Sequence, residues 1–173
     1  MQLRYFNQPH FENGSLKLIS QVLKEQGISR PLICTDPGLV VIGMTDKIRN
    51  LLSNELSPTF YTETPANPTE QAVNDALELY KQNNCDGVVG FGGGSSMDLA
   101  KTVALMANHE GNVVDYSVNE GGTGKIQETV PTVAIPTTSG TGSEVSLGAV
   151  IIMNDGRKLI LASNHLVPNA AIC

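Results

Sequence analysis

The protein has 173 residues, of which 17 are acidic and 11 basic, giving a formal net charge of −6. A chain of this length is expected to form one domain with its own core, and its acidic balance argues against nucleic-acid binding, which uses a basic face. No apolar run reaches the ~18–20 residues of a membrane span, and the start lacks a signal-peptide pattern. Three widely spaced cysteines without a C-x-x-C pair favour reduced thiols and a cytoplasmic location.

Short apolar runs alternate with helical patterns along most of the chain. Their spacing predicts strands at residues 31–35, 59–62, 87–91 and 132–135, and helices at 15–26, from 68 onward and at 96–108. Thr69 is a suitable N-cap for the second of these helices. Strands that alternate with helices of about a dozen residues indicate an α/β protein whose parallel sheet is covered by helices on both faces.

The last third of the chain has a different pattern. A long apolar run at 145–153 is followed by Asn154-Asp-Gly-Arg157 and by a second apolar run at 158–162. Asp-Gly between apolar runs is a strong hairpin signal, because glycine supplies the positive φ of the tight turn. We therefore expect a β-hairpin appended to the parallel sheet.

Three consecutive glycines, Gly92–Gly94, stand between the strand at 87–91 and the helix after it. Without side chains there, backbone N–H groups can point at a phosphate, and the helix N-terminus adds a favourable dipole. Ser95 is expected to cap this helix, with Asp98 three residues further on. The alternative is a tight turn in which Asp98 is only a cap. The spacing departs from the dinucleotide fingerprint, because Ser95 stands where a third glycine or alanine is needed.

A second loop, Pro136-Thr-Thr-Ser-Gly-Thr-Gly-Ser-Glu144, follows the strand at 132–135. Its hydroxyls can donate to a phosphate or to a nicotinamide amide without the desolvation cost of a charge. Two such loops at the ends of neighbouring strands would face one crevice, which is where open α/β sheets bind ligands.

These motifs, in this order, resemble the N-terminal half of the iron-containing (group III) alcohol dehydrogenases, over essentially the whole chain. The matching segments are Gly14-Ser-Leu16, Thr35-Asp-Pro-Gly-Leu39, Ala66-Asn-Pro-Thr69, Gly92 to Asp98, Pro136 to Glu144, and Lys158. The related glycerol dehydrogenases and dehydroquinate synthases typically share only the glycine loop. The resemblance implies a Rossmann-like sheet and a dinucleotide-binding domain that spans residues 1–173.

The resemblance also implies roles in binding NAD. Asp36 would hydrogen-bond the adenosine ribose and favour NAD over NADP, since its charge would repel a 2′-phosphate; the alternative for Asp36 is a surface turn. Gly93, Gly94 and Ser95 would hold the pyrophosphate, with Asp98 near the nicotinamide side.

Five further residues complete the implied cofactor site. Three of them, Thr137, Thr138 and Thr141, would line its adenine and phosphate side. Lys158 would reach a ribose hydroxyl. Asn67 would sit near the adenine edge, although it could equally be a helix-start residue.

The family's metal site is the part that this sequence does not match. In the family, one Asp and three His of a following all-helical domain hold a divalent iron, which polarises the alcohol oxygen. Here His10, His109 and His165 are scattered, and each is expected to be a surface or loop residue. We therefore expect no metal ligand and no catalytic residue in this chain, and the helical domain to be absent from it.

The function implied is that of an NAD-dependent oxidoreductase, which passes hydride between the nicotinamide and the carbinol carbon of a small alcohol or aldehyde. Only its cofactor-binding half is expected here, so the 173 residues alone should bind NAD weakly and catalyse nothing. Fe(II) or another divalent metal would belong to the full-length enzyme. A homo-oligomer is expected, with a strand at residues 3–6 that can pair at a sheet edge. The alternative is a stand-alone nucleotide-binding or scaffold domain without catalysis.

Overall fold

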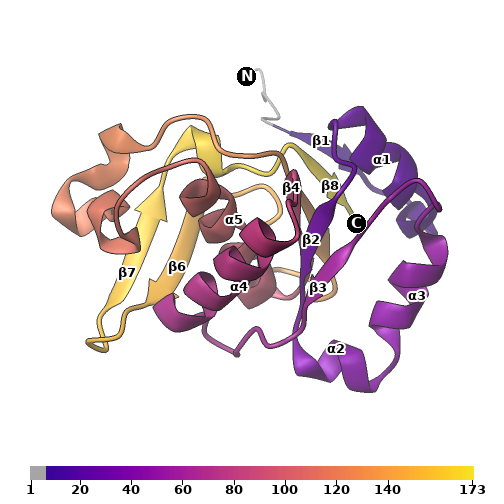
Figure 1. Ribbon diagram of the computed structural model, residues 1–173, viewed down its shortest axis with the longest axis horizontal. Helices are drawn as coiled ribbons and strands as arrows, with labels where there is room; N and C mark the ends of the chain where they lie inside the picture. Colours follow the sequence, from indigo (N-terminus) through magenta and orange to yellow (C-terminus); the bar gives the residue numbers. More distant parts are fainter. Residues whose placement is uncertain (1–6) are drawn as a thin grey trace.

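A six-stranded sheet in the order β1-β8-β5-β4-β2-β3 runs through the protein, and every pairing in it is parallel (Figure 1). The computed structural model describes residues 7–173. The strands are β1 (Gln8–His10), β2 (Pro31–Cys34), β3 (Thr59–Tyr61), β4 (Gly87–Gly92), β5 (Thr132–Pro136) and β8 (Ala170–Ile172). The helices are α1 (Ile19–Glu25), α2 (Pro37–Val41), α3 (Met44–Leu51), α4 (Glu70–Gln82) and α5 (Gly94–Ala107).

Two hydrophobic clusters cover the two faces of the sheet. In β2, Leu32 and Cys34 belong to the cluster that includes α4 and α5, whereas Ile33 belongs to the cluster that includes α1 and α3. Successive strand residues point to opposite faces, so a strand buried on both sides reads as a continuous apolar run. The predicted Rossmann-like α/β fold with helices on both faces is confirmed.

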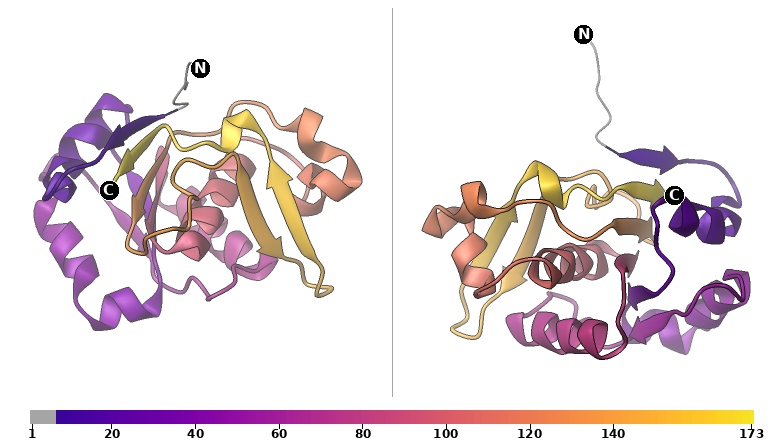
Figure 2. Two further views of the ribbon diagram at one scale, coloured as in Figure 1. Left: turned by 180° about the vertical axis from the view of Figure 1, so that it is seen from behind. Right: turned by 45° about the horizontal axis from the view of Figure 1, so that its top comes forward.

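Helix α5 is buried on two sides, because a separate two-stranded hairpin packs on it away from the sheet. The hairpin strands are β6 (Gly148–Ile152) and β7 (Lys158–Ala162), and they are antiparallel as predicted. Ala149, Ile151, Leu159 and Leu161 alternate along them and are buried, and the last three belong to the cluster that includes α5. The hairpin lies at the opposite end of the molecule from α2 and α3 (Figures 1 and 2).

The helix starts show which local predictions were correct. Thr69 caps α4, since its Oγ1 accepts a hydrogen bond from the Ala72 backbone N at 3.1 Å. The cap predicted at Ser95 is wrong: Gly93 is the N-cap of α5, and the Ser95 hydroxyl donates instead to the Ala66 carbonyl. Ser95 is therefore the second residue of the helix, and its hydroxyl does not bond the free backbone N–H groups of the first turn.

Other boundaries differ from the sequence expectations. The helix at 15–26 is a short 3-10 turn, η1 (Ser15–Leu18), followed by α1. The first hairpin strand begins at Gly148 and not at 145. The helices α2 and α3 were not predicted, and the strand expected at residues 3–6 lies outside the described residues. Within residues 7–173, no helix combines the length and the apolar character needed to cross a membrane.

The contact between α5 and β4 depends on a missing side chain at Gly90. A Cβ at this position would lie 2.8 Å from the Met97 Cα and 3.1 Å from the Ala100 Cβ. We predict that Gly90→Ala lowers the free energy of unfolding by about 2 kcal/mol or more, because backbone must move to admit the methyl group. Urea unfolding followed by circular dichroism measures this.

The matched control is Gly124→Ala, since a Cβ at Gly124 meets no atom within 4 Å. This variant should stay within about 0.5 kcal/mol of the parent, as surface substitutions usually do. Equal stability of the Gly90 and Gly124 variants would show that α5 does not need this close approach.

Candidate functional site

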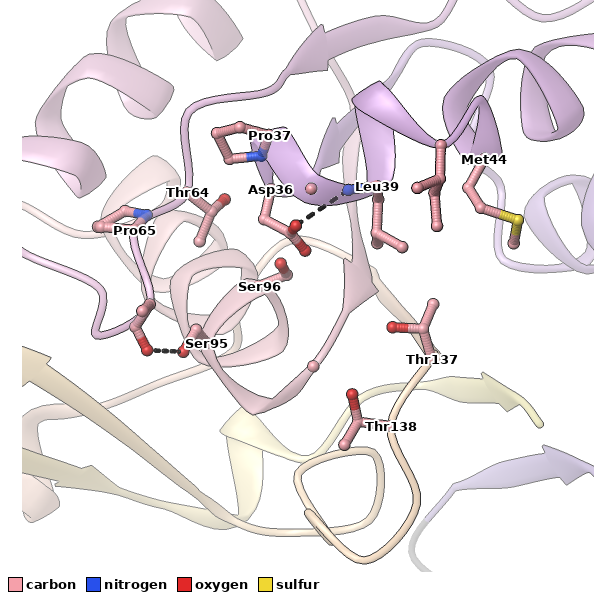
Figure 3. A pocket seen from close by; sticks show the side chains of 14 residues that line it. Asp36, Pro37, Leu39, Met44, Thr64, Pro65, Ser95, Ser96, Thr137 and Thr138 are labelled. Atoms are coloured by element: carbon pink, nitrogen blue, oxygen red, sulfur yellow. Dashed lines mark hydrogen bonds between the residues drawn. The ribbon is translucent and has the colours of Figure 1, made fainter.

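A pocket of about 750 Å³ lies at the carboxyl ends of the central strands (Figure 3). It is lined by the segment after β2, the segment after β3, the first turn of α5 and the loop after β5. From β2 the chain continues outward to β3, whereas β4 leads to β5 in the other direction. The pocket therefore occupies the switch point of the sheet, which is where open α/β sheets bind ligands.

Asp36 lies on one wall of this pocket, directly after β2. It is the N-cap of α2, and its Oδ1 accepts a hydrogen bond from the Leu39 backbone N at 3.1 Å. Its Oδ2 is 3.2 Å from the place that a Cβ of Gly92 would take. The carboxylate thus serves a helix start and also faces the glycine loop, so the turn role and a ligand-binding role are compatible.

At Gly92 the glycine loop approaches its neighbours too closely for a side chain. Gly92 has a φ of +150°, and a Cβ there would lie 2.5 Å from the Ser96 Oγ. At Gly93 and Gly94 a Cβ would instead project toward the second loop, 3.4 Å from the Thr138 Oγ1 and 3.6 Å from the Thr141 Cβ respectively. Because Gly93 and Gly94 have no side chains, the space between the two loops stays free of side-chain atoms from the glycine loop.

The hydroxyl loop after β5 forms the facing wall. Thr137 and Thr138 line the pocket across from Asp36, and Ser95 and Ser96 lie between the two walls (Figure 3). Thr141 lies beyond Thr138 beside Gly94, and its Oγ1 hydroxyl is 3.2 Å from the Glu144 Oε2. The structure therefore brings together most of the residues expected to bind the cofactor: Asp36, Gly93, Gly94, Ser95, Thr137, Thr138 and Thr141.

Asp98 connects α5 to the hairpin. Its Oδ1 accepts a hydrogen bond from the Ser143 Oγ at 2.7 Å, and its Oδ2 accepts one from the Val150 backbone N at 3.0 Å. Burial raises the pKa of this carboxyl group, while the two hydrogen bonds and the charges of Lys101 and Lys158 oppose the rise. Asp98 is thus not a helix cap: one carboxylate oxygen holds Ser143 in the loop before β6, and the other binds Val150 within β6.

Five of the ten expected residues lie outside the lining of this pocket: Gly94, Asp98 and Thr141, described above, and Asn67 and Lys158. Asn67 is exposed just before α4, next to Ala66, which does line the pocket. Lys158 is exposed at the start of β7, where its charge acts on Asp98. Both remain beside the site without forming its wall.

The structure adds pocket residues that sequence reasoning did not single out. They come from α2, from the start of α3, from the segment after β3 and from α5, and comprise Leu39, Ile42, Met44, Thr64, Pro65 and Ser96. Thr64 is 1% exposed, and its Oγ1 has no hydrogen-bond partner among the described residues. For Thr64 and Pro65 the useful signal was their position directly after the predicted strand at 59–62, because such strand ends converge in a parallel sheet. Ile42 and Met44 lie further along the chain and carried no such signal.

Within residues 7–173, no group of three or more His, Cys, Asp or Glu side chains could hold a metal ion. The His109 ring is occupied by backbone contacts, with Nδ1 at 2.9 Å from the Leu105 O and Nε2 accepting from the Gln127 N at 2.9 Å. His165 is exposed and His10 half-buried. The described residues therefore do not fit a metal centre of this kind.

Comparison with known proteins defines the class to which this fold and site belong. The family model described as iron-containing alcohol dehydrogenase matches residues 7–173. The chain belongs to this family, as the resemblance of its motifs predicted.

Particular relatives agree with this assignment. The chain is 44% identical over 170 residues to 4-hydroxybutyrate dehydrogenase of Cupriavidus necator, covering 98% of this chain and 44% of that protein. It is 40% identical over 139 residues to choline dehydrogenase of Bacillus subtilis, covering 80% of this chain and 35% of that protein. The chain spans less than half the length of these curated relatives.

Solved structures of other proteins share the fold of this chain. A 1,3-propanediol oxidoreductase superposes with a TM-score of 0.90 at 27% identity, covering 99% of this chain and 45% of that one. The sulfoacetaldehyde reductase of Bifidobacterium kashiwanohense in complex with NAD⁺ superposes with a TM-score of 0.87 at 28% identity, covering 98% and 45%.

The Ser143–Asp98 hydrogen bond provides a test of how the hydroxyl loop is held. We predict that Ser143→Ala lowers the free energy of unfolding by about 1–2 kcal/mol at neutral pH, because the half-buried carboxylate of Asp98 loses a donor. The pKa of Asp98 should rise further, since this hydrogen bond favours its charged form. Urea unfolding and an NMR titration of the carboxyl group measure the two effects. Ser57→Ala, at an exposed position, is the control, and equal effects at both serines would contradict the prediction.

Proposed function

We propose that this chain is the dinucleotide-binding domain of an NAD-dependent oxidoreductase that acts on the CH–OH group of small alcohols or on the matching aldehydes. One observation carries the proposal: the glycine start of α5 faces the threonine loop across an open gap at the switch point of the sheet. Family membership and the NAD⁺ complex of a structural neighbour support it.

The residues around the gap suit the parts of a dinucleotide. Backbone N–H groups at Gly93 and Gly94, at the positive end of the α5 dipole, would donate to the pyrophosphate. The hydroxyls of Thr138 and Thr141 would add neutral donors on the opposite side. The Asp36 carboxylate would accept hydrogen bonds from the adenosine ribose. Apolar side chains beside Asp36, among them Leu39 and Met44, give the adenine ring a surface to contact.

The remaining expected residues act at the edge of this arrangement. Asp98, together with Lys158, whose charge lowers the pKa of Asp98, would lie toward the nicotinamide side, and Asn67 toward the adenine edge. When bound, NAD supplies the hydride acceptor, and the chain's own work is to hold and orient it.

The substrate and the metal belong to the same proposal but not to these residues. The described part of the chain has no metal-binding cluster, so no catalytic step is assigned to it. We propose that the metal and the alcohol bind to the part of the family's proteins that this chain does not match, which is more than half of their length. A cytoplasmic homo-oligomer fits the proposal, in line with free thiols at Cys34, Cys85 and Cys173.

Gly94→Ala tests the cofactor site directly. The added methyl group would make ordinary contact with Thr141 but would occupy the gap proposed for the pyrophosphate. We predict that NAD affinity, measured by isothermal titration calorimetry, falls about tenfold or more. Stability should stay equal or rise by up to about 1 kcal/mol, because alanine is the better helix former.

Gly124→Ala again serves as the control and should leave NAD affinity unchanged. A parent chain that binds no NAD would refute the proposed function. Unchanged affinity in Gly94→Ala would refute the assignment of the pyrophosphate to this gap.

Asp36 is expected to set the preference between the two nicotinamide dinucleotides. We predict that the parent binds NAD more tightly than NADP and that Asp36→Asn narrows or reverses this preference, because the repulsion of a 2′-phosphate is removed. Asparagine keeps the N-cap of α2, so this variant isolates the charge. Asp36→Ala loses both the charge and the cap and should also destabilise the fold by about 1 kcal/mol. Equal affinities of the parent for NAD and NADP would remove this role.

A further inference from the structure

Lys101 is a buried lysine on the side of α5 that faces the hairpin. It is 1% exposed, and its Nζ donates to the Ser146 carbonyl at 2.9 Å and to the Gly148 carbonyl at 3.0 Å. Lysine side chains are almost never buried to this extent unless they are paired, because the ammonium group loses its hydration. A buried ammonium that binds two carbonyls of one loop marks that loop as a segment held in a defined position.

Asp98 holds the same segment from one turn earlier on α5. Its two hydrogen bonds reach Ser143 and Val150, on either side of the two carbonyls bound by Lys101. Two charged side chains of one helix therefore bind residues 143–150 at four points.

The segment needs such support, because it has little regular structure between β5 and β6. Two of its backbone hydrogen bonds are short-range turns, from Val145 N to Gly142 O and from Ser146 N to Ser143 O, and a third reaches Leu147 O from Ser163 N after β7. It is also continuous with the threonines of the pocket, since Ser143 N donates to the Thr141 Oγ1 at 3.3 Å. A displacement at 143–148 would therefore move Thr141 relative to Gly94.

We propose that Lys101 is a positioning residue for the cofactor: together with Asp98 it fixes the hydroxyl loop so that Thr138 and Thr141 face Gly93 and Gly94 at the spacing a pyrophosphate needs. This inference rests on the proposed function. Lys101 itself lies outside the lining of the pocket, and its effect on binding runs through the loop.

The charge of Lys101 gives the proposal a pH signature. Burial lowers its pKa to about 8, while the nearby Asp98 and Glu144 carboxylates work in the opposite direction. Lys158 on β7 is the remaining charged group near Lys101, and its positive charge lowers the pKa of Asp98. An anionic ligand held by the loop favours the charged lysine, so the pKa of Lys101 should be higher in the NAD complex than in the free chain. NAD affinity is then greatest below pH 8 and falls as the pH rises above it.

Lys101→Met tests the proposal, because methionine keeps an unbranched side chain of similar length and loses the charge and the donors. NAD affinity is measured by calorimetry at pH 7 and pH 9.5 in the parent, in Lys101→Met and in Lys81→Met, a control at an exposed position of α4. Hydrogen–deuterium exchange of residues 141–150 without NAD is compared in the same proteins, corrected for intrinsic exchange rates.

The expected result has three parts. The parent and the Lys81 variant bind NAD several-fold more weakly at pH 9.5 than at pH 7. Lys101→Met binds NAD about tenfold more weakly than the parent at pH 7, with little further change at pH 9.5. Exchange at 141–150 is faster in Lys101→Met, while exchange in β4 and β5 is unchanged.

Contrary results separate this inference from the proposed function. A parent that binds NAD, next to a folded Lys101→Met that binds it equally well, overturns the inference alone. A parent that binds no NAD overturns the proposed function and this inference with it. If Lys101→Met does not fold, the parent decides: equal NAD affinity at pH 7 and pH 9.5 overturns the inference, and a several-fold loss supports it.

Discussion

The close approach of helix α5 to strand β4 is the constraint on which the rest of the structure depends. Gly90 has no side chain, so the helix backbone can lie directly against the strand. The helix must then begin immediately where the strand ends, and its N-terminus comes to the carboxyl edge of the sheet. Strand β5 pairs with β4 in register, with Gly92 opposite Pro136, so the hydroxyl loop leaves the sheet at the same level. One packing contact thus places both walls of the pocket.

The second side of α5 carries a different kind of contact. Toward the sheet the helix is held by apolar packing, whereas toward the hairpin it adds two charged groups, the half-buried Asp98 and the buried Lys101. Replacing buried polar pairs by apolar side chains often leaves stability unchanged, so such pairs are weak evidence for stability. Here the two charged side chains fix position more than they add stability. Apolar contact alone would let β6 slide along α5, whereas four hydrogen bonds to specific partners set one register.

Much of this fold could be predicted from the sequence, because the signals are local. Buried parallel strands read as apolar runs, Thr69 reads as a cap, and Asp-Gly reads as a hairpin turn, since Gly156 does have a positive φ of 85°. The N-cap was wrongly predicted at Ser95 because glycine and serine are both common N-cap residues, and all four residues from Gly93 to Ser96 are of these types. Only packing selects which of them begins the helix. Thr64 and Lys101 were not singled out, because what makes each notable is burial against segments far away in the chain.

The charge distribution of the pocket is the physical basis of the dinucleotide preference that we propose. Asp36 is the one ionisable side chain among its lining residues. Positive potential at the gap must therefore come mainly from the N-terminus of α5, whose dipole is equivalent to about half an elementary charge and acts over its first turn. Such a source suits the two charges of a pyrophosphate held close to the backbone. It cannot also offset a third phosphate at the far wall, where Asp36 adds repulsion. The proposed selection for NAD over NADP would then need no residue beyond one carboxylate, provided that the two loops keep their spacing.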